Sequence, residues 1–156
     1  METSHEHDAA PWYVDFVLPV LLAEARKSYG REIRSNLTAA GFTDMPRNGA
    51  RVVGGIARSG RPMGDVVAEL GVSKQAASQL VDTLVLRGYL LRVPDPEDRR
   101  RMNLDLTDRG RDAAEEVRAA VDGVDAALLA AVGPEAVLSL RRALAVLAEL
   151  PALGAG

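Results

Sequence analysis

Five polar residues in the middle of the chain have the types and spacing that recognition of DNA bases requires. Ser73, Lys74, Gln75, Ser78 and Gln79 recur at helical spacing. Glutamine can bond to N6 and N7 of adenine together, lysine reaches guanine or a phosphate, and serine suits either. The backbone N–H groups at the start of such a helix also attract a phosphate. The pattern predicts a helix that reads double-stranded DNA in the major groove.

Three consecutive arginines, Arg99, Arg100 and Arg101, follow prolines and acids at residues 94–98. Proline and aspartate favour a tight turn, and a guanidinium group binds phosphate bidentately or enters a narrow minor groove. Because phosphates repel a carboxylate, we expect Asp98 to orient an arginine rather than to contact DNA. The alternative is a solvated charged turn, whose surface ion pairs contribute about 0–1 kcal/mol.

A helix, a tight turn and a second helix must position the five polar residues. The helix predicted over residues 63–70 ends at Gly71, and Ser73 caps the next helix, Lys74 to Arg87, which Gly88 closes. Apolar residues of this second helix face inward, whereas Asp82 joins its polar face; the inward residues are Ala77, Leu80, Val81 and Leu84. This is the helix-turn-helix pattern, although a soluble helical hairpin with a polar face would also show it.

A β-hairpin is expected to carry the arginines. Residues 89–93 are mostly apolar and residues 101–106 alternate with period two, which predicts two strands joined by the charged turn. Thr107 then caps a long helix, and Gly133-Pro134 separates it from a last one. The apolar stripes of these two helices have little other domain to cover, so we expect them to pack against a second copy of the chain.

Residues 11–40 are expected to be helical, with Pro19 either kinking one long helix or opening a second one at its first turn. Thr43 or Asp44 is placed to cap the next helix, with Pro46 in its first turn. Aromatic residues make up only 4% of the chain, and alanine, leucine, arginine and glutamate dominate it. The predicted fold class is therefore mainly α with a small β-hairpin.

Charge is distributed unevenly along the chain. Residues 47–101 contain ten Arg or Lys and six Asp or Glu, which gives this segment a net charge of +4. The whole chain has a net charge of −3, so the remainder carries −7. A basic middle between acidic ends indicates a module that faces an anion.

The chain offers little for catalysis, metal binding or membrane insertion. It has no cysteine, and its only histidines, His5 and His7, lie in an acidic stretch that we expect to be a frayed tail. The glycines at 49–55 lack the Lys-Ser/Thr of a phosphate-binding loop. We recognise no signal peptide, and no apolar run approaches the roughly 18 residues of a spanning helix. We therefore expect a cytoplasmic protein that is not an enzyme and binds no cofactor or metal.

Four short motifs follow one another in the central part of the chain. They are Leu70-Gly71-Val72-Ser73-Lys74-Gln75-Ala76, Gly88-Tyr89, Asp98-Arg99-Arg100 and Leu106-Thr107 with Gly110. In order and spacing they resemble the MarR (multiple-antibiotic-resistance regulator) family of winged helix-turn-helix transcriptional regulators. The Asp-Arg-Arg motif followed by Leu-Thr is the most diagnostic part.

The resemblance implies a two-fold homodimer. Residues 11–44 and 107–150 would form its helical dimerisation regions, residues 45–106 its winged helix-turn-helix DNA-binding domain, and residues 1–10 and 151–156 its tails. The two recognition helices would enter successive major grooves, and the wing arginines would reach the flanking minor grooves.

The implied function is that of a sequence-specific transcriptional regulator acting on a pseudo-palindromic operator: a repressor that a ligand relieves, with an activator as the alternative. Relatives bind small aromatic or phenolic effectors between the dimerisation and DNA-binding regions, and the effector releases DNA. The lack of cysteine removes the peroxide-sensing variant of this mechanism. The alternative function is a winged-helix module for dimerisation or for binding another protein, without specific DNA binding.

Overall fold

The computed structural model describes residues 11–59, 70–94 and 102–150. Several sequence-based predictions lie outside these ranges. They concern His5, His7, most of the helix at 63–70, and the turn with Asp98, Arg99, Arg100 and Arg101.

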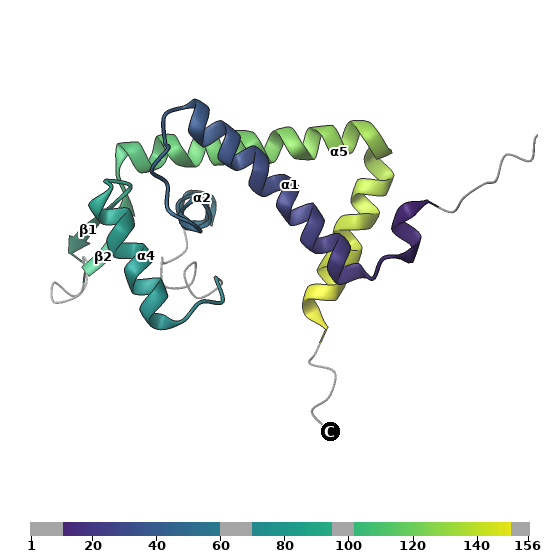
Figure 1. The fold of residues 1–156 in the computed structure, drawn as a ribbon, viewed down its shortest axis with the longest axis horizontal. Helices are drawn as coiled ribbons and strands as arrows, with labels where there is room; N and C mark the ends of the chain where they lie inside the picture. Colours follow the sequence, from purple (N-terminus) through teal and green to yellow (C-terminus); the bar gives the residue numbers. More distant parts are fainter. Residues whose placement is uncertain (1–10, 60–69, 95–101, 151–156) are drawn as a thin grey trace, which may run out of the picture.

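The fold is mainly helical with one small hairpin, which confirms the predicted fold class (Figure 1). The elements in chain order are the 3-10 helix η1 (Trp12–Asp15), α1 (Leu18–Ala39), α2 (Gly49–Ser59), α4 (Lys74–Leu86), β1 (Leu90–Pro94), β2 (Met102–Leu106) and α5 (Asp108–Glu149). The strands pair antiparallel, with Leu90 opposite Leu106 and Pro94 opposite Met102.

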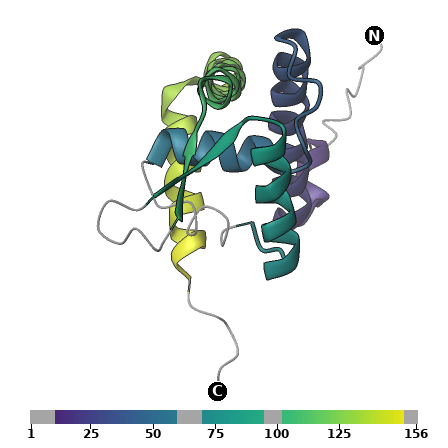
Figure 2. The ribbon, with the colours of Figure 1, turned by 90° about the vertical axis from the view of Figure 1, so that its left-hand side faces the viewer.

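The elements form two groups joined by long helices. α2, α4 and the hairpin gather at one end of the molecule, and η1 lies at the other with the C-terminal part of α5 (Figure 1). α1 runs diagonally between the two ends, while the first part of α5 forms a long edge. Figure 2 looks onto the end that carries the hairpin and α4.

Pro19 opens a helix rather than kinking one. It occupies the first turn of α1, after the short helix η1 and an extended Val17. Proline is tolerated there because the N–H that it lacks would have no partner inside the helix. Of the two alternatives that the sequence leaves open, the second is therefore observed.

The prediction that Thr43 or Asp44 caps the second helix is wrong. α2 begins only at Gly49, after a loop in which Asn48 has a positive φ of 66°. Pro46 lies in this loop and accepts a hydrogen bond from the Gly49 N–H at 2.8 Å. Asp44 has tertiary partners instead, which local spacing does not reveal.

The hydrophobic core lies where α1, α2, α4 and the hairpin meet the first half of α5. Its buried members are Leu37, Val52, Val53, Leu84, Tyr89, Leu90, Leu106, Ala113, Ala114 and Val117. Gly54 allows α2 to approach α5 closely, since a Cβ there would lie 2.9 Å from Val117 Cγ1. This close approach accounts for a glycine that otherwise weakens the helix.

The long C-terminal helix consists of two arms. Gly133 has non-helical backbone angles (φ 79°, ψ 167°), and Pro134 follows it. We call residues 108–132 the first arm of α5 and residues 134–149 its second arm. The predicted break at Gly133-Pro134 is thus present, and Figure 1 shows the second arm turning away from the first.

Many large apolar side chains at the far end of the molecule are exposed. They come from η1, the first turns of α1 and both sides of the α5 break, and we call them the terminal apolar surface. Its residues are Trp12, Tyr13, Val14, Phe16, Val17, Leu18, Val20, Leu22, Leu129, Val132, Leu138, Leu140, Leu144, Val146, Leu147 and Leu150.

The apolar character of α5 exceeds the sequence-based expectation. An 18-residue window of this helix has a mean hydropathy of 1.5, so by length and composition alone it could cross a membrane. The expectation that no segment is apolar enough is therefore not supported. A helix that packs against another protein chain has the same composition, and the break at Gly133 divides α5 into arms of different direction.

Candidate nucleic-acid interface

The start of α4 is built as a polar, solvent-facing helix end. Ser73 caps the helix, and its Oγ accepts a hydrogen bond from the Ala76 N–H at 3.2 Å. All five predicted base-reading residues are exposed, namely Ser73, Lys74, Gln75, Ser78 and Gln79. They lie within two turns of the N-terminus, where a helix can approach a phosphate or a base edge.

The opposite side of α4 holds the helix to the core. Val81 and Leu84 are buried, and Ala77 and Leu80 are half-buried, as their inward assignment predicts. Since the apolar side is fixed, the polar side has a defined direction toward solvent. A rigid helix of this kind can present several side chains to one DNA groove.

Asp82 belongs to an ion pair between α4 and the hairpin. Its Oδ1 lies 2.6 Å from Nη2 of Arg92 on β1, and both side chains are more than half exposed. A surface pair of this kind contributes only about 0–1 kcal/mol, but it fixes the strand beside the helix. Asp82 therefore lies on the polar side of α4 and also pairs with a residue of the hairpin.

The charged turn joins the paired ends of β1 and β2. Pro94 lies opposite Met102, so residues 95–101 form the connection at this end of the hairpin. Asp98, Arg99, Arg100 and Arg101 are in that connection, outside the described residues. The strands that flank them are in place next to α4, as Figure 2 shows.

A second polar cluster, which sequence patterns did not predict, links the residues next to the hairpin to the α1–α2 loop. The Tyr89 hydroxyl donates to Asp44 Oδ1 at 2.6 Å, and Arg109 Nη2 donates to the same oxygen at 2.7 Å. The Arg109 guanidinium also lies 4.6 Å from the centre of the Tyr89 ring, and Arg87 donates to the Asp44 carbonyl oxygen. The cluster joins the α1–α2 loop, the end of α4 and the start of α5.

The electrostatics of this cluster favour an ionised Asp44. The hydrogen bond from Tyr89 and the nearby Arg109 hold the pKa of Asp44 below its ordinary value, although burial opposes this. Burial and the Asp44 carboxylate raise the pKa of Tyr89, so its hydroxyl stays a donor. Because the Asp44 pKa is lowered by folding, its contribution to stability is present above its ordinary pKa and is lost as pH falls through the lowered value.

The junction of the hairpin and α5 explains the Leu-Thr motif. Thr107 caps α5, as predicted, with its Oγ1 accepting from the Gly110 N–H at 2.9 Å and donating to the Gly88 carbonyl oxygen at 2.5 Å. A Cβ on Gly110 would lie 2.1 Å from the Tyr89 carbonyl oxygen. The junction therefore requires glycine at position 110.

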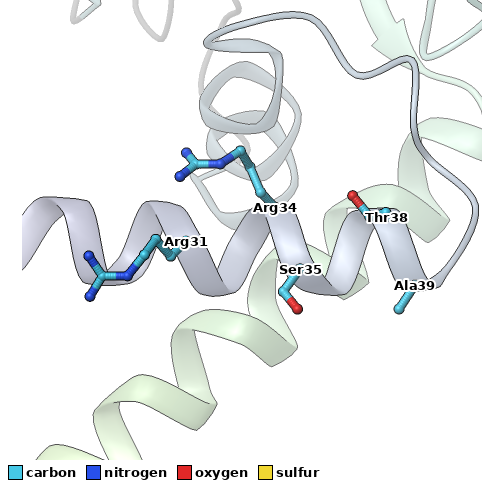
Figure 3. A pocket seen from close by; sticks show the side chains of 5 residues that line it. All are labelled: Arg31, Arg34, Ser35, Thr38 and Ala39. Carbon is cyan, nitrogen blue, oxygen red and sulfur yellow. The ribbon is translucent and has the colours of Figure 1, made fainter.

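An open groove of about 590 Å³ lies along the C-terminal half of α1. Its lining residues are Arg31, Arg34, Ser35, Thr38 and Ala39; Figure 3 shows Arg34 and Thr38 at one edge of the helix and Ser35 and Ala39 at the other. Arg31 donates to Ser28 Oγ at 2.9 Å, and neither arginine forms an ion pair with another of the described residues. Two guanidinium groups next to two hydroxyls form a surface suited to an anion.

Comparison with solved structures shows the same fold in other proteins. NadR in complex with 4-hydroxyphenylacetate is 24% identical and has a TM-score of 0.68, with 97% of this chain and 100% of that chain covered. The repressor CouR, bound to a 23-mer DNA duplex, is 24% identical with a TM-score of 0.66 and coverages of 88% and 96%. The S. aureus MepR–DNA complex is 19% identical with a TM-score of 0.68 and coverages of 87% and 100%.

Sequence comparison gives a family for the central segment. Comparison with curated proteins finds no match. Residues 43–101 match the sequence model of the MarR family. This segment runs from the loop before α2 to the end of the charged turn, and so contains α4 and β1.

The capped helix α4 and the adjoining hairpin are those of a winged helix-turn-helix fold. Residues 43–101 are similar to the MarR family, and the described part of the chain has the fold of the solved structures of NadR and of MarR from E. coli. The resemblance inferred from the four motifs is thereby confirmed.

Proposed function

We propose that the chain is a sequence-specific regulator of transcription that binds double-stranded DNA as a homodimer on a pseudo-palindromic operator. The observation that carries this proposal is α4, whose apolar side is fixed in the core while its capped, polar N-terminal turns face solvent. Such a helix has the dimensions and donors to read a major groove. The presence of DNA in the CouR and MepR structures supports the proposal.

The terminal apolar surface supports a second copy of this chain as the partner. Exposed large apolar side chains gathered at one end of a molecule indicate an interaction site. Because it is formed by both ends of the chain, a two-fold contact would place the two DNA-binding ends outward on opposite sides. The two α4 helices would then meet two half-sites of one operator.

The wing assignments are proposed from their position. Residues 95–101 connect β1 to β2 in the sequence, and arginine is suited to phosphates and to a narrow minor groove. We propose Arg99, Arg100 and Arg101 as the contacting groups and Asp98 as the acid that orients them.

Substitutions on α4 and in the turn test the DNA-binding proposal. Lys74→Ala and Gln75→Ala should each weaken binding by on the order of 1–3 kcal/mol, with relaxed selectivity at one base position, and Arg100→Ala should weaken binding to all sequences. Binding is measured by fluorescence anisotropy on a duplex selected from fragments of the source genome, at several salt concentrations. Lys27→Ala and Arg118→Ala remove comparable charges from exposed positions on α1 and α5 and serve as matched controls.

Two outcomes would contradict the DNA-binding proposal. The first is equal affinity of the three variants and the two controls. The second is failure of the unmodified protein to retard any fragment at low salt, which would favour a winged-helix module for dimerisation or protein binding.

We further propose that an anionic effector relieves repression by binding in the α1 groove. Arg31 and Arg34 provide guanidinium groups for a carboxylate, and Ser35 and Thr38 provide hydroxyls for a second polar group. The groove lies on α1, which runs between the two ends of the molecule (Figure 1), so a bound molecule can bias their relative position. The 4-hydroxyphenylacetate bound to NadR combines a carboxylate with a phenol, which makes it a suitable probe.

Binding of this probe depends on Arg34 if the groove is the effector site. We expect 4-hydroxyphenylacetate to raise the thermal unfolding midpoint and Arg34→Gln to weaken its binding roughly 10- to 100-fold, because a charge-assisted bond contributes about 1.5–3 kcal/mol. Isothermal titration calorimetry measures the affinity, and Arg26→Gln on the same helix is the control. Equal affinities for the two variants would place the effector elsewhere.

The location of the protein in the cell and its mode of action follow from the same proposal. A regulator of transcription acts where the DNA is, so we propose a cytoplasmic protein. Its action would consist of binding alone, without catalysis or a cofactor.

A further inference from the structure

Three polar side chains join α1 to both arms of α5. The Tyr29 hydroxyl donates to Asp125 Oδ1 at 2.5 Å, and Arg141 Nη2 donates to Asp125 Oδ2 at 3.2 Å. Asp125 lies on the first arm and Arg141 on the second, so each oxygen of one carboxylate holds a group from a different helical segment. The hydrogen bond to Asp125, together with partial burial, raises the pKa of Tyr29, which keeps the hydroxyl protonated and able to donate.

These residues are placed to restrain the bend of α5 at Gly133, which we call the corner. Asp125 precedes Gly133 by eight residues and Arg141 follows it by eight. At a helical rise of 1.5 Å per residue, each lies about 12 Å from the corner. An ion pair at equal distances along two arms restricts the angle between them, and Tyr29 adds the third side, since α1 crosses between the arms (Figure 1).

Within the described part of one protomer, the second arm of α5 is largely exposed. The corner itself is one residue, Gly133, in a conformation that a residue without a side chain adopts easily. Val137 is half-buried and residues 138–150 are all exposed, so the second arm has little buried surface within the described part of the chain. The polar contacts at Asp125 therefore have a large share in setting the direction of the first arm relative to the second.

A small rotation at the corner has a large effect at the DNA-binding end. The first arm extends 25 residues from Gly133 to Asp108, which is about 38 Å. A rotation of about 10° would move its far end by about 7 Å, or roughly two base pairs along B-DNA. The hairpin and α4 are attached at that far end, so they would move with it.

We propose that Tyr29, Asp125 and Arg141 fix the corner of α5 and thereby set the spacing between half-sites that the dimer accepts. This inference rests on the proposed function of the chain as a dimeric DNA-binding protein. The three side chains are positioning residues that do not contact DNA. They would determine specificity through geometry rather than through base contacts.

The angle at the corner can be measured without DNA. The chain has no cysteine, so the double variant Arg118→Cys/Arg142→Cys places one spin label on each arm at exposed positions. Dilution of the labelled protein with unlabelled protein isolates the distance within one protomer. We expect a narrow distance distribution in this background, and a distribution that broadens or shifts by several ångströms when Tyr29→Phe or Asp125→Ala is added.

Matched variants distinguish loss of the restraint on the angle between the arms from a general loss of structure. Asp122→Asn removes an exposed carboxylate from the same arm and should leave the distribution narrow. The exchange Asp125→Arg/Arg141→Asp reverses the ion pair and should restore much of the narrow distribution, which a merely damaged fold would not do. Unchanged distributions in both Tyr29→Phe and Asp125→Ala would overturn the proposal.

Operators with altered spacing test the consequence for DNA. Half-sites moved apart by one or two base pairs should lose about tenfold or more in affinity for the unmodified protein, and much less for the Tyr29→Phe and Asp125→Ala variants. A changed distance between the arms with an unchanged preference for half-site spacing would refute the role in specificity. A changed distance between the arms in a protein that binds no DNA would support the restraint at the corner and refute the proposed function.

Discussion

Replacement of Gly110 by alanine is expected to destabilise the folded protein by about 3 kcal/mol, because it forces two backbone segments apart. The added Cβ would lie 2.1 Å from the Tyr89 carbonyl oxygen and 3.1 Å from Leu106 Cδ2. No rotamer change relieves an overlap with a backbone oxygen. That oxygen also accepts a hydrogen bond from the Thr107 N–H at 3.1 Å, so moving it weakens the junction between the hairpin and α5.

Gly123 provides a matched control for this substitution. It lies on the first arm of the same helix, and a Cβ there would meet no atom within 4 Å. Gly123→Ala should therefore stabilise the protein, by up to about 1 kcal/mol, since alanine favours the helix over glycine. Urea unfolding followed by circular dichroism at one protein concentration compares the two variants. Equal free energies of unfolding would mean that the Tyr89 carbonyl oxygen does not lie as close to Gly110 as the structure describes.

The Gly110 junction illustrates what local sequence patterns reveal and what they do not. Thr107 is recognisable as a helix cap because threonine before a helical run has a local reason to be there. Gly110 is recognisable only as part of a family motif. Its physical reason, the nearby Tyr89 carbonyl oxygen, comes from a segment about 20 residues earlier that packs against it only in the folded chain.

Asp44 shows how the same reasoning fails. An aspartate before a helical run is a good cap by local criteria, and on that basis the second helix is predicted to start too early. In the structure its carboxylate accepts hydrogen bonds from Tyr89 and Arg109, which are 45 and 65 positions away. Because these partners are distant in sequence, no periodicity or spacing rule indicates them.

The exposed polar face of α4 was predictable for the opposite reason. Helical periodicity separates the buried Val81 and Leu84 from the exposed Lys74 and Gln75 without any tertiary information. The direction in which this face points is a different matter. It depends on the packing of α4 in the core. As proposed above, it also depends on the corner of α5, which lies at the opposite end of the molecule (Figure 1).

Replacement of Leu144 by glutamate is expected to convert the proposed dimer to monomers at micromolar concentration. Leu144 is 38% exposed within one protomer and belongs to the terminal apolar surface. In a monomer a charge at this partly covered position costs on the order of 1 kcal/mol. In a two-fold interface each substitution is present twice, and each buried carboxylate without a partner costs several kcal/mol.

The expected weakening of the dimer is at least about a thousandfold, since two penalties of roughly 2 kcal/mol or more add to 4 kcal/mol. Sedimentation equilibrium distinguishes the 16.6 kDa chain from a dimer of twice that mass. Leu86→Glu is the matched control, because Leu86 is 86% exposed at the end of α4, far from the terminal apolar surface. That variant should remain dimeric.

DNA binding links the dimer to the proposed function. A monomer of the Leu144→Glu variant would keep one intact recognition helix, so its affinity for the operator should fall toward that of a single half-site. Joining two of the variant chains by a flexible linker should recover part of the lost affinity, because the linker replaces the interface as the source of effective concentration. A Leu144→Glu variant that still sediments at twice the chain mass would show that the terminal apolar surface has another partner, and the two-fold arrangement of the recognition helices would have to be abandoned with it.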